Sequence, residues 1–161
     1  MTSISDIAKT LEALKHIAPS GFALAMRINF TTPTYLFQTF SPEWSKHYSA
    51  KGYMFDDPVV IWGLNNSGVA RWSDLTSGDQ TIFHDAATYG LVYGVACSTE
   101  RHGAKSFGGF SRADREFTDA ECSETHDLFE TLDQQIGQFE AIDPSAREQL
   151  RFFASQVSVG I

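Results

Sequence analysis

Residues 44–60, WSKHYSAKGYMFDDPVV, combine two helix signals with a dense group of aromatic rings. Trp44 and Tyr48 are four residues apart, so in a helix they share one face. Asp57 suits a helix N-cap, and Pro58 suits the first helical position that follows it. The stretch therefore predicts two consecutive short helices, with a carboxylate beside aromatic side chains where the second begins.

The segments on either side of this stretch alternate between helical and strand patterns. Helical spacing and caps predict a long helix near each end of the chain, and period-2 or β-branched runs predict hairpins between them. The expected elements are helix 3–18, strands 22–30 and 34–40 around a turn at 31–33, helices 42–50, 58–65 and 79–89, strands 93–101 and 106–112 around a turn at 102–105, and helices from 117 past 139 and 144–157. This order predicts an α+β fold: an α-β-α sandwich with a mostly antiparallel central sheet of about five strands between helical layers.

Length and charge limit the possible functions. A chain of 161 residues fits one domain, so we expect residues 1–161 to form a single unit. The formal net charge is -8, and residues 114–141 carry nine carboxylates against the single Arg115. Clustered Lys or Arg would be needed to bind nucleic acid there. The simplest interpretation of this acidic run is a solvated helix face.

Cysteine use and the N-terminal sequence indicate a cytoplasmic protein. Cys97 and Cys122 form no metal-binding or disulfide pattern, so we expect reduced thiols in the core. The first 21 residues lack a long apolar run and carry early acids, which argues against a signal peptide or a membrane span.

Catalytic signatures are missing from the sequence. The five histidines fall in five different predicted elements without a neighbouring nucleophile, and no two of them are three or four residues apart. The glycines of residues 103–109 lie in a predicted hairpin and not between a strand and a helix, so they do not indicate a nucleotide site. We expect no enzyme activity, no metal and no cofactor.

The aromatic segment has two open interpretations. Its rings could fill a core, or they could line a mostly apolar ligand pocket that contains a few fixed polar groups. The residues concerned are Phe37, Phe40, Trp44, Tyr48, Tyr53, Phe55, Trp62 and Trp72.

The ordered spacing of Trp44, Tyr48, Asp57-Pro58 and Trp72 resembles the autoinducer-binding domain of LuxR-type quorum-sensing regulators. Gly52-Tyr53, the run GLVYG at 90–94 and Ser111 are also similar to that family, and the resemblance extends over roughly residues 11–139. The ligand of this family is an N-acyl homoserine lactone, which has a lactone and amide head on a fatty chain.

The resemblance implies a role for each matched residue. Trp44 would donate its indole N–H to the lactone carbonyl, Asp57 would accept the amide N–H, and the Ser111 hydroxyl would donate to the amide carbonyl. Tyr48 would lie along the acyl chain, and Trp72 would cover the lactone. Gly94 would leave space, and the remaining expected ligand-binding residues are Phe40, Tyr53, Val59 and Phe83.

Two departures from the family pattern affect these expectations. Phe40 stands where many relatives carry a Tyr that bonds the acyl amide carbonyl, so the acyl group of the signal is in question. We also expect no C-terminal helix-turn-helix domain in this chain, because nothing after residue 139 is long or basic enough to form one. We therefore expect a sensor domain that couples ligand binding to dimerisation and to DNA binding by another domain. One alternative is a single-domain relative that inhibits a full-length regulator by pairing with it. Another is a small-molecule enzyme such as a lactone hydrolase, which would need a nucleophile or a metal site that the sequence does not indicate.

Overall fold

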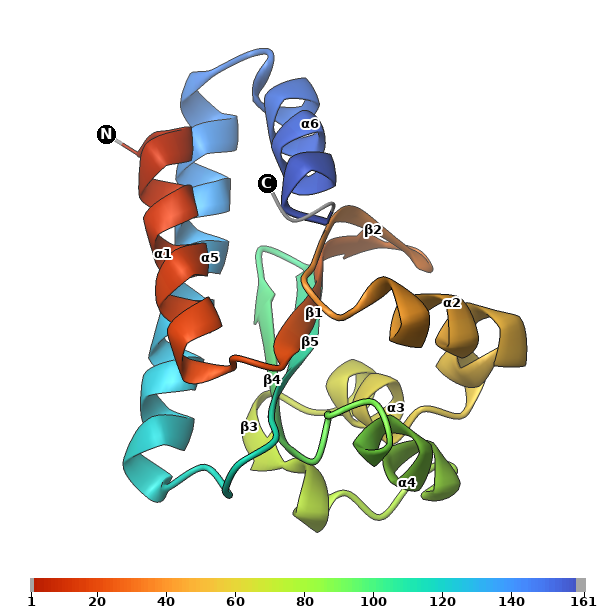
Figure 1. Ribbon diagram of the computed structural model, residues 1–161. Helices are drawn as coiled ribbons and strands as arrows, with labels where there is room; N and C mark the ends of the chain where they lie inside the picture. Colours follow the sequence, from red (N-terminus) through yellow and green to blue (C-terminus); the bar gives the residue numbers. More distant parts are fainter. Residues whose placement is uncertain (1, 159–161) are drawn as a thin grey trace.

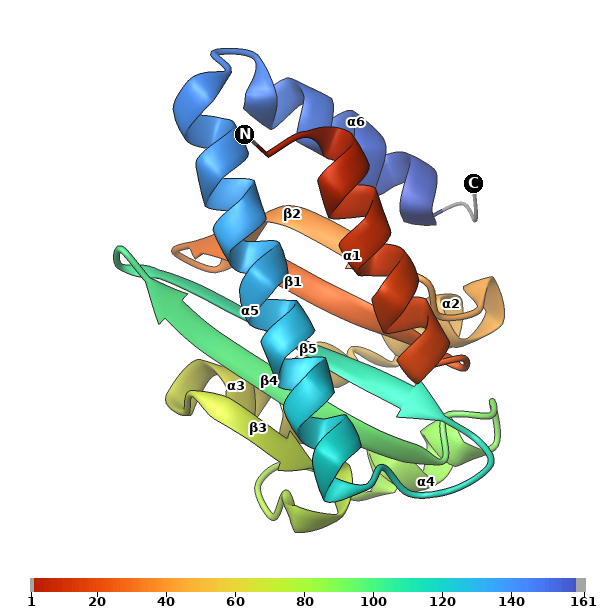
Figure 2. The same cartoon turned by 90° about the vertical axis from the view of Figure 1, so that its left-hand side faces the viewer.

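The computed structural model describes residues 2–158, which form five strands between two groups of helices (Figures 1 and 2). The elements are α1 (Ile4–Ile17), β1 (Gly21–Asn29), β2 (Thr32–Gln38), α2 (Pro42–Lys51), the 3₁₀ turn η1 (Tyr53–Phe55), α3 (Pro58–Asn65), β3 (Gly68–Arg71), the 3₁₀ turn η2 (Trp72–Asp74), α4 (Thr81–Ala87), β4 (Tyr93–Arg101), β5 (Ala104–Arg112), α5 (Asp119–Ile142) and α6 (Ala146–Ser158). This confirms the predicted α+β sandwich.

The sheet has the strand order β2-β1-β5-β4-β3, and all neighbouring strands are antiparallel. Figure 2 shows α1, α5 and α6 over one face of this sheet, whereas α2, α3 and α4 lie behind it. The edge strand β3, of only four residues, had no assigned position in the sequence, because so short a segment shows little period-2 alternation.

The hairpin turns are tighter than their residues suggested. The first turn is at residues 30–31, so the prediction of a turn over 31–33 was wrong, and Pro33 lies within β2. An edge strand tolerates proline because half of its backbone N–H groups need no partner in the sheet. The second turn is at residues 102–103, which places Lys105 in β5.

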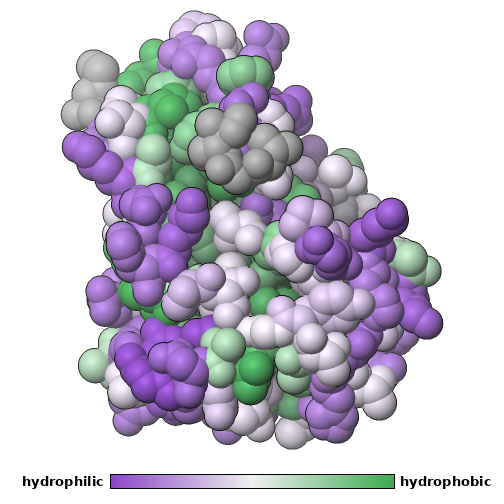
Figure 3. All heavy atoms as spheres, in the orientation of Figure 1, coloured by the Kyte–Doolittle hydropathy of each residue, from purple (hydrophilic) through white to green (hydrophobic). Residues whose placement is uncertain are grey.

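Strand alternation separates two apolar clusters. Phe22, Leu24 and Met26 of β1 point into the larger cluster, between the sheet and α1, α5 and α6. The second cluster lies on the other face and includes Trp44 and Trp72. Hydrophilic residues cover much of the face in Figure 3, where apolar residues appear as separate patches. No helix within residues 2–158 has both the length and the apolar character needed to cross a bilayer.

The acidic helix α5 is solvated on only part of its surface. Asp133 is 1% exposed, and its carboxylate lies 3.2 Å from Nε of Arg27 and 2.8 Å from Nε of Arg101. Asp133 therefore does not belong to the solvated helix face that was predicted for the acidic run. A buried carboxylate needs cationic partners, and β1 and β4 provide them.

Both cysteines are free and buried, in agreement with the prediction of core thiols.

The predicted N-terminal cap is also confirmed, because Ser3 and Asp6 form a capping box at the start of α1.

Candidate ligand-binding site

A cavity of about 720 Å³ lies between the sheet and the layer of α2, α3 and α4. The sheet forms the floor of this cavity. The cavity is deep there because its floor includes Ala23 and Ala25 of β1, which have small side chains, and Gly109 of β5, which has none. Aromatic and aliphatic side chains from the helices form most of the wall. Seven of the predicted site residues line it: Phe40, Trp44, Tyr48, Asp57, Val59, Trp72 and Phe83.

Among residues 2–158, Asp57 is the only acidic or basic residue that lines the cavity. It is the N-cap of α3, as predicted, and its Oδ1 accepts the backbone N–H of Val59 at 2.8 Å. Its Oδ2 accepts the hydroxyl of Tyr48 at 2.7 Å. A carboxylate offers about four lone-pair sites, so it can accept a further donor from the cavity.

Burial raises the pKa of Asp57 above its ordinary value, and the hydrogen bonds from Tyr48 and from the α3 backbone oppose that rise. The pKa of Tyr48 is also raised, because its ring is buried and its phenolate would lie against the Asp57 carboxylate. Tyr48 therefore remains a neutral donor that holds Asp57 in place.

Aromatic contacts fix the two tryptophans at the wall. The ring of Trp44 lies 5.8 Å from that of Tyr48, which confirms that these residues share a face of α2. The ring of Trp72 stacks on Phe83 at 5.2 Å. The indole N–H of Trp72 is buried and has no partner within residues 2–158.

Gly94 acts on the cavity through Trp72. A Cβ at position 94 would lie 2.1 Å from the indole ring, so the absence of a side chain makes room for the ring itself. At Gly109 a Cβ would be 3.4 Å from the same ring, an ordinary contact. The two glycines thus have different roles: one admits the indole and the other gives depth to the floor.

Ser111 and Tyr53 do not line the cavity. The hydroxyl of Ser111 donates to the backbone carbonyl of Tyr93 at 2.7 Å, and the β5 residues that reach the wall are Phe107 and Gly109. The hydroxyl of Tyr53 donates to Oδ2 of Asp85 at 2.6 Å.

The contact between Tyr53 and Asp85 connects η1 to α4 beside the cavity. Nε2 of His47 lies 2.5 Å from the same Asp85 oxygen. Hydrogen bonds from Tyr53 and His47 lower the pKa of Asp85, and the bond to Asp85 raises the pKa of Tyr53 to about 12. This group supports the helices around the cavity without reaching its interior.

Sequence reasoning missed the two alanines of the cavity floor. Ala23 and Ala25 alternate with large apolar residues along β1, and this pattern was a usable signal for a hollow face. In β5 the adjacent Gly108 and Gly109 between two phenylalanines did indicate enlarged space, and Gly109 is the one of the two that lines the cavity.

The described fold and cavity agree with the family comparison. The family model for the autoinducer binding domain matches residues 19–134, and the chain therefore belongs to this domain family of LuxR-type transcriptional regulators. It is a regulatory and not an enzymatic family.

Individual relatives agree with this assignment. The chain is 28% identical over 122 residues to the transcriptional activator protein VanR of Vibrio anguillarum, a match that covers 70% of this chain and 50% of that protein. It thus spans about half the length of this curated relative.

Solved structures of the family share the fold. A structure of SdiA in complex with octanoyl-rac-glycerol superposes with a TM-score of 0.67 at 22% identity, covering 87% of this chain and 62% of that one. The N-acylhomoserine lactone dependent factor CepR2 from Burkholderia cenocepacia gives a TM-score of 0.60 at 16% identity, covering 85% and 84%.

Proposed function

We propose that the chain senses an N-acyl homoserine lactone, bound in the cavity between the sheet and α2, α3 and α4. The observation that carries this proposal is the half-buried carboxylate of Asp57 in a largely apolar cavity, to which the described residues contribute no other acidic or basic side chain. An amide N–H of the ligand satisfies the remaining acceptor site of Asp57, and the acyl chain fills the apolar space.

The two indoles serve the oxygen atoms of the head group. Trp44 donates to the lactone carbonyl, and Trp72 with Phe83 closes the wall over the ring. Because Ser111 is bonded to Tyr93, its hydroxyl does not serve the amide carbonyl in this arrangement. The indole N–H of Trp72 is buried and has no partner among the described residues, so the ring would have to turn before it could donate to the head group.

The charge of the cavity also selects against anionic lipids. A fatty acid carboxylate would be buried near Asp57 without a cation on the wall, which is strongly unfavourable. A neutral monoacylglycerol, the type of ligand named for SdiA, remains a rival because its hydroxyl groups can donate to Asp57.

The residues that the structure describes form the ligand-binding domain. We propose that an occupied domain pairs with a second copy, and that a DNA-binding domain beyond these residues responds in the cytoplasm. The length of VanR, about twice the matched region, supports this arrangement.

The test compares two neighbouring aspartates. Asp57→Asn should weaken lactone binding about 10- to 100-fold, since a hydrogen bond to a charged group contributes about 1.5–3 kcal/mol. Asp56→Asn is the matched control because Asp56 is exposed and does not line the cavity. Titration of purified variants with octanoyl homoserine lactone and with octanoyl glycerol measures both effects. Equal lactone affinity in Asp57→Asn and in the control would contradict the proposal, and tighter binding of the glycerol ester would favour the rival ligand.

A further inference from the structure

The cavity reaches the surface, and several of the apolar side chains that line it, here termed the rim, are exposed. Phe30 is 96% exposed, Phe55 80%, and Met54, Leu64 and Leu36 about half. All five line the cavity, and they come from the β1–β2 hairpin, η1 and α3. Large apolar residues that are both exposed and part of a cavity lining indicate a surface that an apolar group covers.

The opening extends well away from the polar head site. Asp57 is at the start of α3 and Leu64 is near its end, seven residues further on, which corresponds to roughly 10 Å along a helix. Ile61 of α3 and Phe107 of β5 line the cavity between them. An apolar path therefore leads from the carboxylate to the rim.

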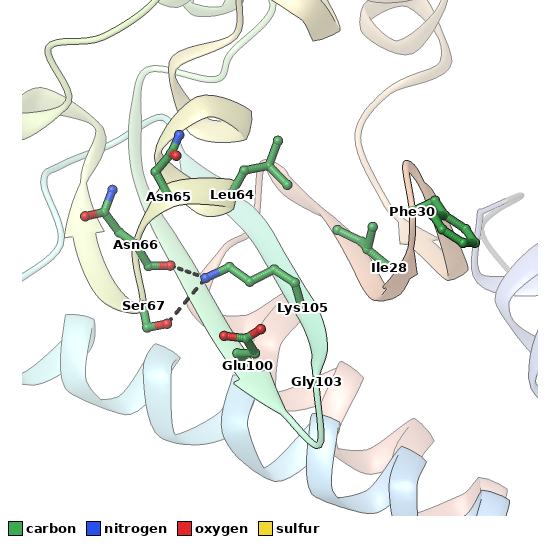
Figure 4. A pocket seen from close by; sticks show the side chains of 9 residues that line it. All are labelled: Ile28, Phe30, Leu64, Asn65, Asn66, Ser67, Glu100, Gly103 and Lys105. Atoms are coloured by element: carbon green, nitrogen blue, oxygen red, sulfur yellow. Dashed lines mark hydrogen bonds between the residues drawn. The ribbon is translucent and has the colours of Figure 1, made fainter.

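Beyond the rim the apolar path gives way to polar surface. A second groove of about 480 Å³ shares Ile28, Phe30 and Leu64 with the cavity (Figure 4). Its other walls are polar: in Figure 4, Lys105 of β5 reaches toward the loop after α3 and donates to the Asn66 carbonyl and the Ser67 hydroxyl. The outer end of the path thus meets charged groups and water.

We propose that the acyl chain of the signal leaves the cavity through this opening, so that the protein prefers long chains and leaves their distal end at the surface. This inference rests on the proposed function and defines its ligand class. The proximal carbons fill the enclosed part of the cavity, and the distal carbons cover Phe30, Phe55 and Leu64. A polar group at the chain end lies outside the apolar walls, toward the groove of Lys105.

A chain-length series tests the first part of this proposal. Butanoyl, octanoyl and dodecanoyl homoserine lactones are titrated into the purified protein by calorimetry. Each fully covered methylene strengthens binding about fourfold, so affinity should still rise at least tenfold from octanoyl to dodecanoyl. Affinity that stops rising at the octanoyl chain would overturn the open path.

Rim variants locate the distal carbons. Phe55→Ser and Phe30→Asn should weaken the dodecanoyl ligand several-fold, with a loss that shrinks as the chain shortens. Asn suits the positive φ of 60° at position 30. Phe152→Ser is the matched control, because Phe152 is 68% exposed on α6 and does not line the cavity. An equal loss for all chain lengths, or an equal loss in the control, would contradict the assigned path.

A chain with a terminal carboxylate tests where the path ends. Dodecanoyl lactone carrying this group at its distal carbon should bind within about tenfold of the methyl-ended ligand, whereas burial of the charge in a closed pocket would abolish binding. Lactones that bind only with short or methyl-ended chains would overturn this inference and leave the proposed function intact. Failure of every lactone to bind would overturn both.

Discussion

Gly94 provides a quantitative test of how the cavity wall is built. In Gly94→Ala the new methyl carbon would lie 2.1 Å from Cδ2 and 2.2 Å from Cε2 of Trp72. Trp72 is only 8% exposed and is stacked on Phe83, so the ring has little freedom to move. Gly94 is in β4 and pairs with Ser111 of the neighbouring strand, so the backbone is also held.

Overpacking a fixed core site costs about 1–3 kcal/mol, and two rigid partners place this case near 3 kcal/mol. For a domain of this size that loss lowers the melting temperature by about 6–12 °C. Gly109→Ala is the matched control, because its methyl would meet the same ring at 3.4 Å and Val59 at 3.5 Å. The control should change the melting temperature by less than about 2 °C.

Thermal unfolding followed by circular dichroism, with and without a lactone, separates the two effects. Gly109→Ala should reduce the stabilisation by ligand, because its methyl occupies the cavity floor, while the free protein stays stable. A Gly94→Ala protein that melts with the wild type, or a Gly109→Ala protein that melts as low as Gly94→Ala, would refute the assigned roles of the two glycines.

Two further predictions concern charge. Because burial raises the pKa of Asp57, lactone affinity should fall as the pH decreases through that raised value, since the protonated acid accepts the amide N–H poorly. Calorimetry between pH 7 and pH 4.5 measures this fall in lactone affinity. In Tyr48→Phe, which lacks the opposing hydrogen bond, the fall should occur at higher pH. In Asp57→Asn, an affinity that does not change with pH would support the assignment to Asp57. Asp133→Ala should cost about 3–5 kcal/mol in chemical denaturation, because it leaves Arg27 and Arg101 without their buried partner. A loss of stability below 1 kcal/mol would show that the ion pairs of Asp133 with these two arginines are not effectively buried.

The pH dependence of folding stability that Asp57 contributes has the opposite sign to that of an ordinary ion-paired carboxylate. The raised pKa means that the folded state holds a proton that the unfolded chain has already released. Between the ordinary carboxyl pKa of 3.8 and the raised value, stability therefore falls as the pH increases. A ligand that donates to the carboxylate offsets this penalty.

The sequence predicts local features of the site better than its extent. The four-residue spacing of Trp44 and Tyr48 fixes a shared helix face, and the Asp57-Pro58 pair fixes a helix start. Neither of these features depends on distant contacts. Ser111 depends on distant contacts. It faces the same side of the sheet as Gly109, two residues earlier in β5, but the position of Trp72 decides how far along β5 the cavity extends. That position follows from packing between elements far apart in the sequence.

Tyr53 illustrates a second reason. Its ring belongs to the aromatic stretch, but its hydroxyl finds Asp85, which is 32 residues further along the chain. No local sequence pattern predicts that Asp85 is the partner of Tyr53. The short strand β3 was likewise not located because its pairing with β4, and not its own composition, makes it a strand.

The two apolar clusters on either side of the sheet differ in what completes them. The cluster under α1, α5 and α6 is filled by side chains of the chain itself, whereas the layer of α2, α3 and α4 surrounds a void of about 720 Å³. One face of the sheet therefore carries a fully packed core, whereas the other carries a layer of helices around a cavity. If the proposed ligand binds there, the stability of the layer of three short helices on the sheet rises with the concentration of that ligand, and this layer is the first part of the molecule to respond to it.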